Sequence, residues 1–396
     1  MSGTVPGGRD PEDDTVPGAE DLAGRARAIL EAHWQPRGYT VPNASVYPHQ
    51  WLWDSCFHAI AWAELGEPDR ALAELRNLFA HQADDGFVPH MTYWDAPDMH
   101  ADFWGRRWTS CLTQPPMYGH ALVELARRGV TIDGDLIERA AAGLRFLVER
   151  RRVDGVITIV HPWETGCDDS PRFDSWYPGP WTPASGKAYK GELVGSVEVD
   201  RATGSPVANP QFCVGSASFT ALVAFNADEL LTLTADDTLI RFVQQAPGEL
   251  GARWDGERET VADDGGRPSS TARTSEALLT VLLDTSADAS GDIFEQLRAT
   301  DAFGGPFGPA QVHRGEPSFD PATYWRGPAW PQLNYLFWVA ARRLGRDDDA
   351  RWLQHATIAG AVASGFAEYW DPDTGRGLGA VPQSWTTLAA VMAAAP

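Results

Sequence analysis

Apolar residues recur every three or four positions along most of this chain, a spacing that places them on one face of an α-helix. Three residues indicate where helices begin. Asp54 and Ser384 are placed to cap helices, and Pro68 suits the first position of a helix. Few segments alternate as a convincing strand does. The pattern predicts helices at about residues 20–34, 55–65, 68–79, 115–129, 135–152, 216–233, 236–245, 275–283, 292–300, 328–344, 347–365 and 384–395.

Long loops separate alternate helices, and they hold most of the Trp, Asp and Glu residues that could do chemistry. They span about residues 84–114, 161–210, 304–327 and 366–383 and are rich in Gly and Pro. Loops of this length in a compact protein are usually functional. About twelve antiparallel helices whose functional loops gather at one end predict an all-α toroid, with an extended helical array as the alternative.

The charge of the chain argues against several classes of partner. The 396 residues carry a formal net charge of -22, whereas nucleic acids and anionic membrane surfaces attract basic proteins. No apolar run approaches the ~18 residues of a membrane span. Residues 1–18 are polar and acidic, so we predict a disordered tail and no secretory signal, followed by one domain over residues 19–396. The four widely spaced cysteines indicate reduced thiols, and we expect a cytoplasmic protein, either monomeric or homo-oligomeric.

Tryptophan is over-represented, with 17 residues, and most of them stand in or beside junctions rich in Gly, Pro and Asp. A large core could hold many of them, but their loop positions favour exposed aromatic walls. A sugar ring needs such walls for its apolar C–H faces, while its hydroxyl groups need planar polar groups such as Asp, Gln and Arg. The composition therefore favours a small-molecule glycoside as the ligand.

The stretch His161–Asp174 packs four carboxylates, a Trp and an Arg into one loop, where Gly166 and Pro171 argue against a regular helix or strand. A carboxyl group desolvated by a Trp ring has a raised pKa, which suits a general acid near neutral pH. The other interpretation is a solvated acidic surface loop.

Glycoside hydrolysis needs an acid that protonates the leaving oxygen and a second carboxylate that activates water or attacks carbon. The candidate acid lies around Asp168. Glu368 is the candidate second group, since it ends an apolar helix and stands between aromatic residues; a surface glutamate at a helix end is the other interpretation.

Motifs for other chemistry are missing from the sequence. The ten histidines form no HxxxH or HxH spacing, and there is no phosphate-binding loop, dinucleotide fingerprint or GxSxG elbow. We therefore expect neither a metal nor an organic cofactor.

Five separated segments together resemble glycoside hydrolase family 63, and within it the bacterial mannosylglycerate and glucosylglycerate hydrolases. They are YPHQWLWDSCF (47–57), LTQPP (112–116), HPWETGCDDSP (161–171), YWRGPAWPQLN (324–334) and FAEYWDPDTGRGLGAVPQSWT (366–386). The resemblance covers the chain from about residue 20 onward. It implies an (α/α)6 barrel and hydrolysis with inversion, without metal or cofactor.

Carried over by motif, the resemblance implies that Asp168 is the general acid and Glu368 the general base. Asp169 stands where the family usually has Asn. A second acidic group there could raise the pKa of Asp168 by repulsion or take over its role. Between Asp174 and Arg253 the chain is also shorter than expected of the glycerate-releasing members. The identity of the leaving group therefore stays open. The region around Met91 is a candidate for covering the aglycone side of the site.

Further residues match the family's sugar contacts. Asp54 also suits a helix N-cap, and Arg326 is as well suited to ordering its motif through a carboxylate as to touching sugar. The implied contacts are Tyr47, Gln50, Trp51, Trp53, Asp54, Gln114, Trp163, Trp325, Gly327, Trp330 and Gln383.

We therefore expect an inverting glycoside hydrolase acting on an α-glucoside or α-mannoside of a small aglycone, of the glucosylglycerate or mannosylglycerate type. One alternative is a different α-glycosidase of the family that acts on a disaccharide. Another is a sugar-binding toroid without catalysis. A third is an eliminase or epimerase on the same toroid, which would need a base such as His161 or Tyr369 in the cleft.

Overall fold

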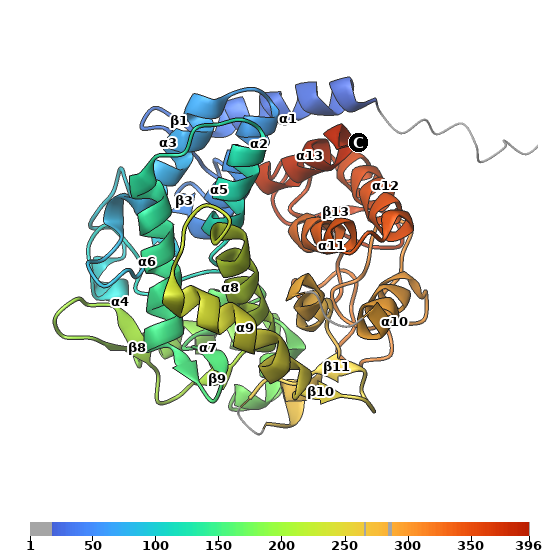
Figure 1. The fold of residues 1–396 in the computed structure, drawn as a ribbon. Coiled ribbons are helices and arrows are strands. Elements are labelled where there is room, and N and C mark those ends of the chain that lie inside the picture. Colours follow the sequence, from blue (N-terminus) through green and yellow to red (C-terminus); the bar gives the residue numbers. More distant parts are fainter. Residues whose placement is uncertain (1–17, 265–266, 284–286, 396) are drawn as a thin grey trace, which may run out of the picture.

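The computed structural model describes residues 18–264, 267–283 and 287–395, apart from the side chains of 19 and 287–291. Nearly all of the predicted acidic tail, residues 1–18, lies outside these ranges. Across the described residues helices dominate and the strands are short (Figure 1). No helix within those ranges combines the length and the apolar character that a membrane crossing requires.

An inner ring of helices surrounds the axis of the molecule, and each member packs against the next. The last member, α13, contacts both α11 and α2 and so closes the ring (Figure 1). In chain order the inner ring consists of α2 (Leu52–Glu64), α5 (Tyr118–Arg127), α8 (Ala217–Leu230), the 3-10 helix η5 (Ser275–Leu283), α11 (Pro331–Arg343) and α13 (Leu388–Ala394).

An outer ring covers the inner one, and its helices alternate with the inner helices along the chain. It consists of α1 (Ala19–His33), α3 (Pro68–Leu78), α6 (Gly134–Arg150), α9 (Asp237–Gly251), α10 (Ala287–Arg298) and α12 (Asp347–Ala363). Each outer helix packs against at least one inner neighbour, as α3 does on α2 and α12 on α11. Six inner and six outer helices make this described part of the chain an (α/α)6 barrel, which confirms the predicted fold class.

Burial explains which helices lie inside. Residues 331–341 of α11 are all buried, as is nearly all of α8, so these helices are enclosed on every side. The outer helices α3 and α6 bury one face and expose the other. Because all inner helices run in the same direction, the loops that precede them meet at one mouth of the barrel.

The predicted helices are largely confirmed, with two differences. Residues 275–283 form a 3-10 helix where an α-helix was predicted. The tract 176–210, predicted to be irregular, contains α7 (Pro183–Val194), which begins with a capping box between Thr182 and Ser185. Its apolar residues follow no clear helical stripe, so the hydrophobic pattern does not reveal it.

Both predicted caps are wrong. Asp54 is the third residue of α2, and Trp51 precedes the helix without a side-chain cap. The helix starts early because the Leu52 amide donates to the His90 carbonyl oxygen, 2.9 Å away. Ser384 opens the 3-10 helix η6 (Ser384–Thr387), and its hydroxyl oxygen lies 2.7 Å from His58 Nε2.

Short antiparallel strand pairs shape the loops. The pair β3–β4 joins Gln50 to Thr92 and thereby ties the long 84–114 loop to the start of α2. The described strands are β1 (Trp34–Gln35), β2 (Tyr39–Thr40), β3 (Gln50–Trp51), β4 (Met91–Thr92), β5 (Arg152–Val153), β6 (Val156–Ile159), β7 (Glu198–Val199), β8 (Pro206–Ala208), β9 (Val214–Gly215), β10 (Trp254–Asp255), β11 (Thr260–Val261), β12 (Tyr369–Trp370) and β13 (Gly377–Leu378). The remaining short helices are α4 (Ala101–Trp104), η1 (Phe79–His81), η2 (Pro162–Thr165), η3 (Pro171–Trp176) and η4 (Pro268–Thr271).

Candidate active site

A cavity of about 340 Å³ lies at the mouth formed by the N-terminal ends of the inner helices. Both predicted catalytic carboxylates line it, although two hundred residues separate them along the chain. Seven of the predicted sugar contacts line it as well. They are Tyr47, Trp51, Trp53, Asp54, Gln114, Trp163 and Gln383.

Asp168 lies between η2 and η3 in a loop that is fastened from several sides. The buried Arg151 donates to Glu164 Oε2 at 2.5 Å, and Glu164 also accepts from the Val160 amide at 2.8 Å. Ser170 donates to Glu276 of η5 at 2.6 Å. Since Glu164 and Glu276 are buried, this stretch is not a solvated surface loop.

The Asp168 carboxylate has two polar partners. The Tyr324 hydroxyl donates to its Oδ1 at 3.3 Å, and the Lys190 ammonium lies 2.7 Å from its Oδ2. Lys190 also lies 2.8 Å from Asp169 Oδ1, so one cation serves two neighbouring carboxylates. Lys190 comes from α7 and is almost completely buried.

Asp169 lies behind Asp168 and does not line the cavity. Burial raises the pKa of Asp169, and the adjacent Asp168 charge raises it further, while Lys190 and Trp181 act in the opposite direction. The pKa of Lys190 is lowered by burial but raised overall, because Asp168 and Asp169 stabilise its charge. The two aspartates therefore form a charge cluster with one ammonium.

Glu368 stands in the connection between α12 and β12. It accepts hydrogen bonds from the Tyr47 hydroxyl at 3.0 Å and from the Ala380 amide at 2.9 Å. Burial raises the pKa of Glu368 to about 7, and the charge of Asp168 also raises it. Glu368 is thus a buried cavity residue, and the surface interpretation is wrong.

Within the described part of the chain, four lining side chains have a buried polar atom without a protein partner. Three of these atoms are acceptors, in Asp54, Gln114 and Gln383, and the fourth is the indole N–H of Trp51. Complete burial raises the pKa of Asp54 well above its usual value, and the Glu368 charge contributes. Unpaired buried polar groups are costly, so their presence in one cavity indicates that a ligand with hydroxyl groups completes them.

Four predicted contacts do not line the cavity. Gln50 is occupied in the scaffold, since Trp94 donates to its Oε1 at 2.8 Å. Trp325 and Trp330 stack on each other at 3.6 Å between ring centroids. A side chain at Gly327 would meet the Asp320 backbone. The two tryptophans pack against Tyr324, and Trp330 also stacks on Tyr369, so this pair builds the wall behind the two tyrosines.

Other predictions concerned residues beside the cavity. Arg326 makes a bidentate ion pair with Asp174, at 2.7 and 2.8 Å, as expected if it orders its motif through a carboxylate and does not touch sugar. His161 is fully buried, and its Nε2 lies 2.8 Å from the Lys190 carbonyl oxygen. Neither His161 nor Tyr369 lines the cavity, so neither is placed as the base that an eliminase would need.

Sequence reasoning missed several lining residues, which are His90, His100, Phe103, Trp104, Tyr324 and Trp385. The first four belong to the 84–114 loop, whose length was the available signal. Lys190 gave no signal, because the helix that carries it was not predicted.

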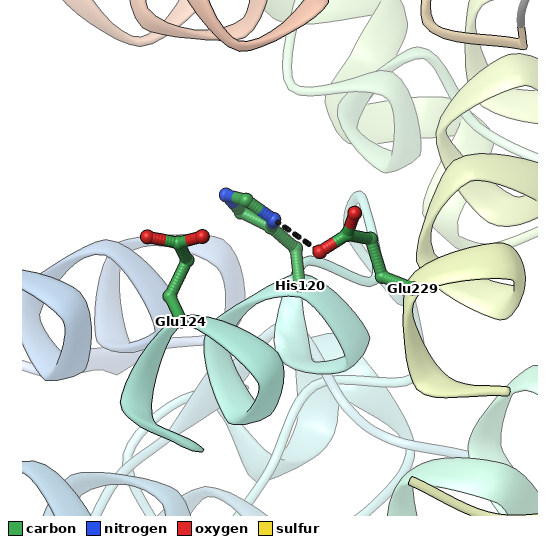
Figure 2. A group of neighbouring side chains, drawn as sticks. All are labelled: His120, Glu124 and Glu229. Atoms are coloured by element: carbon green, nitrogen blue, oxygen red, sulfur yellow. Dashed lines mark hydrogen bonds and ion pairs between the residues drawn. The ribbon is translucent and has the colours of Figure 1, made fainter. Parts of the chain in front are cut away.

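A second cluster of titratable groups lies between inner helices, apart from the residues that line the cavity. His120 and Glu124 of α5 and Glu229 of α8 offer ligand atoms within 4.8 Å of one another (Figure 2). Such a trio could hold a metal ion. The imidazole is already engaged, however, because its Nε2 lies 2.9 Å from the Tyr335 hydroxyl.

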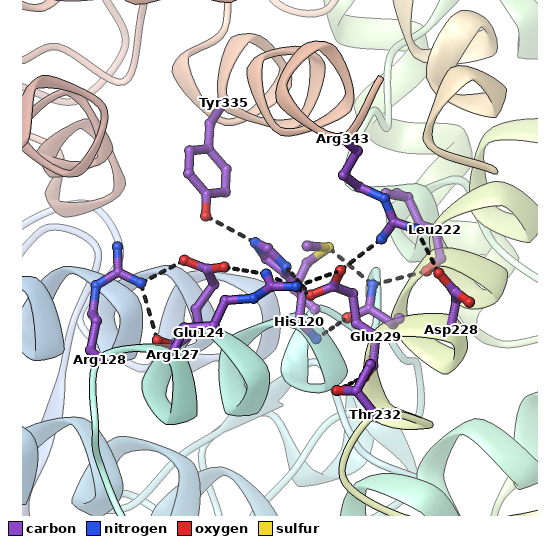
Figure 3. A network of polar contacts seen from close by, with 12 residues as sticks. His120, Glu124, Arg127, Arg128, Leu222, Asp228, Glu229, Thr232, Tyr335 and Arg343 are labelled. Atoms are coloured by element: carbon purple, nitrogen blue, oxygen red, sulfur yellow. Dashed lines mark hydrogen bonds and ion pairs between the residues drawn. The ribbon is translucent and has the colours of Figure 1, made fainter. Parts of the chain in front are cut away.

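Arginines compensate the two carboxylates of this trio (Figure 3). Arg127 donates to Glu124 at 2.6 Å, and Arg343 donates to Glu229 at 2.7 Å. Burial would raise the pKa of Glu229, but His120 and the two arginines lower it to about 2. A metal ion would have to displace these cations, so the geometry favours an ion-pair network that joins α5, α8 and α11.

Comparisons with known proteins agree with this geometry. Residues 47–386 match the protein family described as mannosylglycerate hydrolase MGH1-like glycoside hydrolase domain. Mannosylglycerate hydrolase of Rubrobacter radiotolerans is 28% identical over 93% of this chain and 96% of its own. Glucosylglycerate hydrolase of Mycolicibacterium hassiacum is 26% identical over 93% of this chain and 96% of its own length. The crystal structure of a GH63 mannosylglycerate hydrolase from Thermus thermophilus in complex with Tris and D-glycerate superposes with a TM-score of 0.78 at 26% identity, covering 94% of this chain and 99% of that one.

Proposed function

The chain belongs to the MGH1-like family of glycoside hydrolases, and from this premise we propose that it hydrolyses a small α-glucoside or α-mannoside with inversion of the anomeric configuration. One observation carries the proposal: two carboxylates from distant segments, the half-buried Asp168 and the buried Glu368, line a single cavity beside unpaired hydrogen-bonding groups. This is the arrangement that acid–base hydrolysis of a sugar requires.

Asp168 protonates the glycosidic oxygen, and Glu368 deprotonates water on the opposite face of the sugar ring. An inverting pair is separated by roughly 6.5–9.5 Å, which leaves room for that water. Glu368 suits the role of base because a pKa of about 7 lets it accept a proton near neutral pH. The Tyr47 and Ala380 hydrogen bonds hold the Glu368 carboxylate in place.

The acid must carry a proton before it reacts, and the charge cluster supports this. Asp168 and Asp169 share one ammonium, Lys190, so full ionisation leaves one negative charge uncompensated. Burial and the Asp168 charge raise the pKa of Asp169, so Asp169 holds a proton more readily than an exposed aspartate does. Only Asp168 of the two lines the cavity, so Asp168 is the residue that donates to the glycosidic oxygen.

The sugar is bound by the polar groups that lack protein partners. The acceptor atoms of Asp54, Gln114 and Gln383 receive hydrogen bonds from sugar hydroxyl groups, and Trp51 donates one. Trp53 and Trp163 add apolar faces for the ring.

The relatives' names concern glucose or mannose joined to glycerate, so these are the first substrates to test. A neutral small aglycone or a second sugar is the alternative. The test is a panel of α-glucosides and α-mannosides of glycerate, glycerol and monosaccharides, with sugar release measured for the purified protein. Release of glucose or mannose from a member of the panel, with the β-anomer formed first, supports the proposal. Absence of release from every member and from aryl α-glycosides contradicts it.

A further inference from the structure

The cavity offers little positive charge to an anionic ligand. Its lining includes the carboxylates of Asp54, Asp168 and Glu368 and, among the described residues, no lysine or arginine. Burial lowers the pKa of the lining His90 to about 3, so this imidazole is neutral at physiological pH. His100, the other lining histidine, is exposed, where water and salt screen any charge it carries.

Two buried cations of the segments beside the cavity, Lys190 and Arg326, are already paired with carboxylates. The Lys190 ammonium lies 2.7 Å from Asp168 and 2.8 Å from Asp169 and is thus outnumbered by its partners. Arg326 pairs with both carboxylate oxygens of Asp174. Each of these charges is already paired with a protein carboxylate, which weakens its attraction for a ligand carboxylate.

The unpaired groups of the cavity suit a ligand that both donates and accepts hydrogen bonds. Asp54, Gln114 and Gln383 each have a buried oxygen without a partner among the described residues, Trp51 has an indole N–H, and the two glutamine amides also carry N–H donors. An ionised carboxylate has no proton to donate, whereas each hydroxyl group can donate one. A ligand rich in hydroxyl groups therefore satisfies this cavity better than one that carries a carboxylate.

The 84–114 loop gives the remaining wall an apolar character. Met91, Tyr93, Phe103 and Trp104 all line the cavity, and the Trp104 indole N–H is already used by the Tyr93 hydroxyl at 2.7 Å. Phe103 is 42% exposed, which places it at the rim. Such a wall accommodates the C–H faces of a polyol or of a second sugar and offers no counter-charge.

We propose that the cavity selects an uncharged, hydroxyl-bearing aglycone over an anionic one such as glycerate. This inference rests on the proposed hydrolase function and specifies its substrate class. The discriminating features are the absence of lysine and arginine from the described lining, the ionised Glu368 of the reacting form and the uncharged wall of the 84–114 loop.

The test compares α-glucosylglycerol with α-glucosylglycerate, which differ only in a hydroxymethyl group against a carboxylate, together with the two mannosyl counterparts. We expect kcat/KM for the glycerol compound to be higher by on the order of tenfold to a hundredfold, because like charges are juxtaposed in the glycerate complex. Equal efficiency, or a preference for the glycerate compound, overturns the inference.

A rim variant tests the electrostatic cause. Phe103→Arg should raise the relative kcat/KM for the glycerate compound by on the order of tenfold, and the gain should shrink as ionic strength rises. Phe103→Gln is the matched control, since it removes the aromatic ring without adding charge and should leave the ratio near that of the wild type. If both variants change the ratio equally, charge is not the determinant. Circular dichroism establishes that both variants are folded.

Binding separates this inference from the proposed function. If no glycoside is hydrolysed, the proposed function fails, and calorimetric titration of the same pair of compounds into Glu368→Gln then decides the inference alone. Tighter binding of the glycerol compound supports it. Equal or tighter binding of the glycerate compound, or binding of neither, overturns it.

Discussion

Lys190 places its ammonium nitrogen 2.7 Å from the Asp168 carboxylate, although it comes from α7, a helix outside the five motifs that resemble the family. The same nitrogen lies 2.8 Å from Asp169, the residue that stands where the family usually has Asn. An additional negative charge beside the proposed acid is thus matched by a buried positive charge from another segment. This pairing makes Lys190 a positioning residue for the proposed acid.

Replacing Lys190 with Met should impair catalysis more than binding. Without the ammonium, nothing from Lys190 opposes the rise in the pKa of Asp169 that burial and the Asp168 charge cause, and Asp168 loses an orienting partner. We expect kcat to fall on the order of tenfold to a hundredfold with little change in KM, and the alkaline limb of the pH–rate profile to move to higher pH. Steady-state kinetics across pH measure both effects.

The control is Lys187→Met, which removes a lysine from an exposed position of the same helix. It should leave the kinetics and the pH profile unchanged. If Lys190→Met keeps the alkaline limb of the wild-type pH–rate profile but has lower thermal stability, the role of Lys190 is structural only.

The acid and the base should respond differently to the leaving group. Asp168→Asn should lower kcat for an alkyl glycoside by on the order of 10²–10⁴, but much less for a dinitrophenyl glycoside, whose leaving group needs no protonation. Glu368→Gln should impair both substrates, because each needs activated water. The control is the exposed Glu257→Gln. Rescue of Glu368→Gln, rather than of Asp168→Asn, by the better leaving group would exchange the two roles.

Buried Glu368 should set the acidic limb of the pH–rate profile. A base must be ionised, and burial raises the pKa of Glu368 to about 7. We therefore expect kcat/KM to rise with pH up to about 7, well above the range in which an exposed glutamate titrates. An acidic limb near pH 4 would contradict the burial of this carboxylate in the free enzyme.

The raised pKa of Glu368 also predicts how the stability of the protein depends on pH. A carboxyl group whose pKa is higher in the folded state binds its proton more tightly there, so its contribution is full below the pKa of the unfolded chain and is lost as pH rises through about 7. Glu368→Gln removes this loss. The variant should therefore gain on the order of 3 kcal/mol relative to the wild type between pH 4 and pH 8, measured by urea unfolding at both pH values. A difference that does not change with pH would contradict the prediction.

The fold was predictable because its signals are local. Helical periodicity along the chain identified nearly all of the barrel helices, and long loops marked the mouth. The missed helix α7 contains two glycines and two lysines in its twelve residues and has no apolar stripe, and tertiary contacts such as the Lys190 ion pairs hold it instead. Local pattern therefore reveals helices that bury one face and misses those that are held by specific polar contacts.

The site was predictable in its residue types and less so in its contacts. Tyr47 donates to Glu368 across 321 residues of sequence, and no local pattern reports such a pairing. Asp54 was interpreted as a cap because the pairing of Leu52 with His90, which starts the helix earlier, is also non-local. Trp330 belongs to a matched motif but packs behind the cavity, since a motif preserves the supporting wall as well as the lining.

Gly379 offers a test of how closely the base is positioned. It has a left-handed φ of +71°, and a Cβ atom there would lie 2.4 Å from Glu368 Oε2 and 2.6 Å from the Tyr369 ring. Gly379→Ala should therefore displace the Glu368 carboxylate and lower kcat by about tenfold to a hundredfold, because small misplacements of catalytic groups are costly. The matched control is Gly345→Ala, whose φ of +66° imposes similar backbone strain but whose Cβ would meet nothing within 4 Å. Both variants should lose about 1 kcal/mol of unfolding free energy from the strain alone. Only Gly379→Ala should lose activity beyond that, and equal activity of the two folded variants would mean that the Glu368 carboxylate tolerates displacement or is not the base.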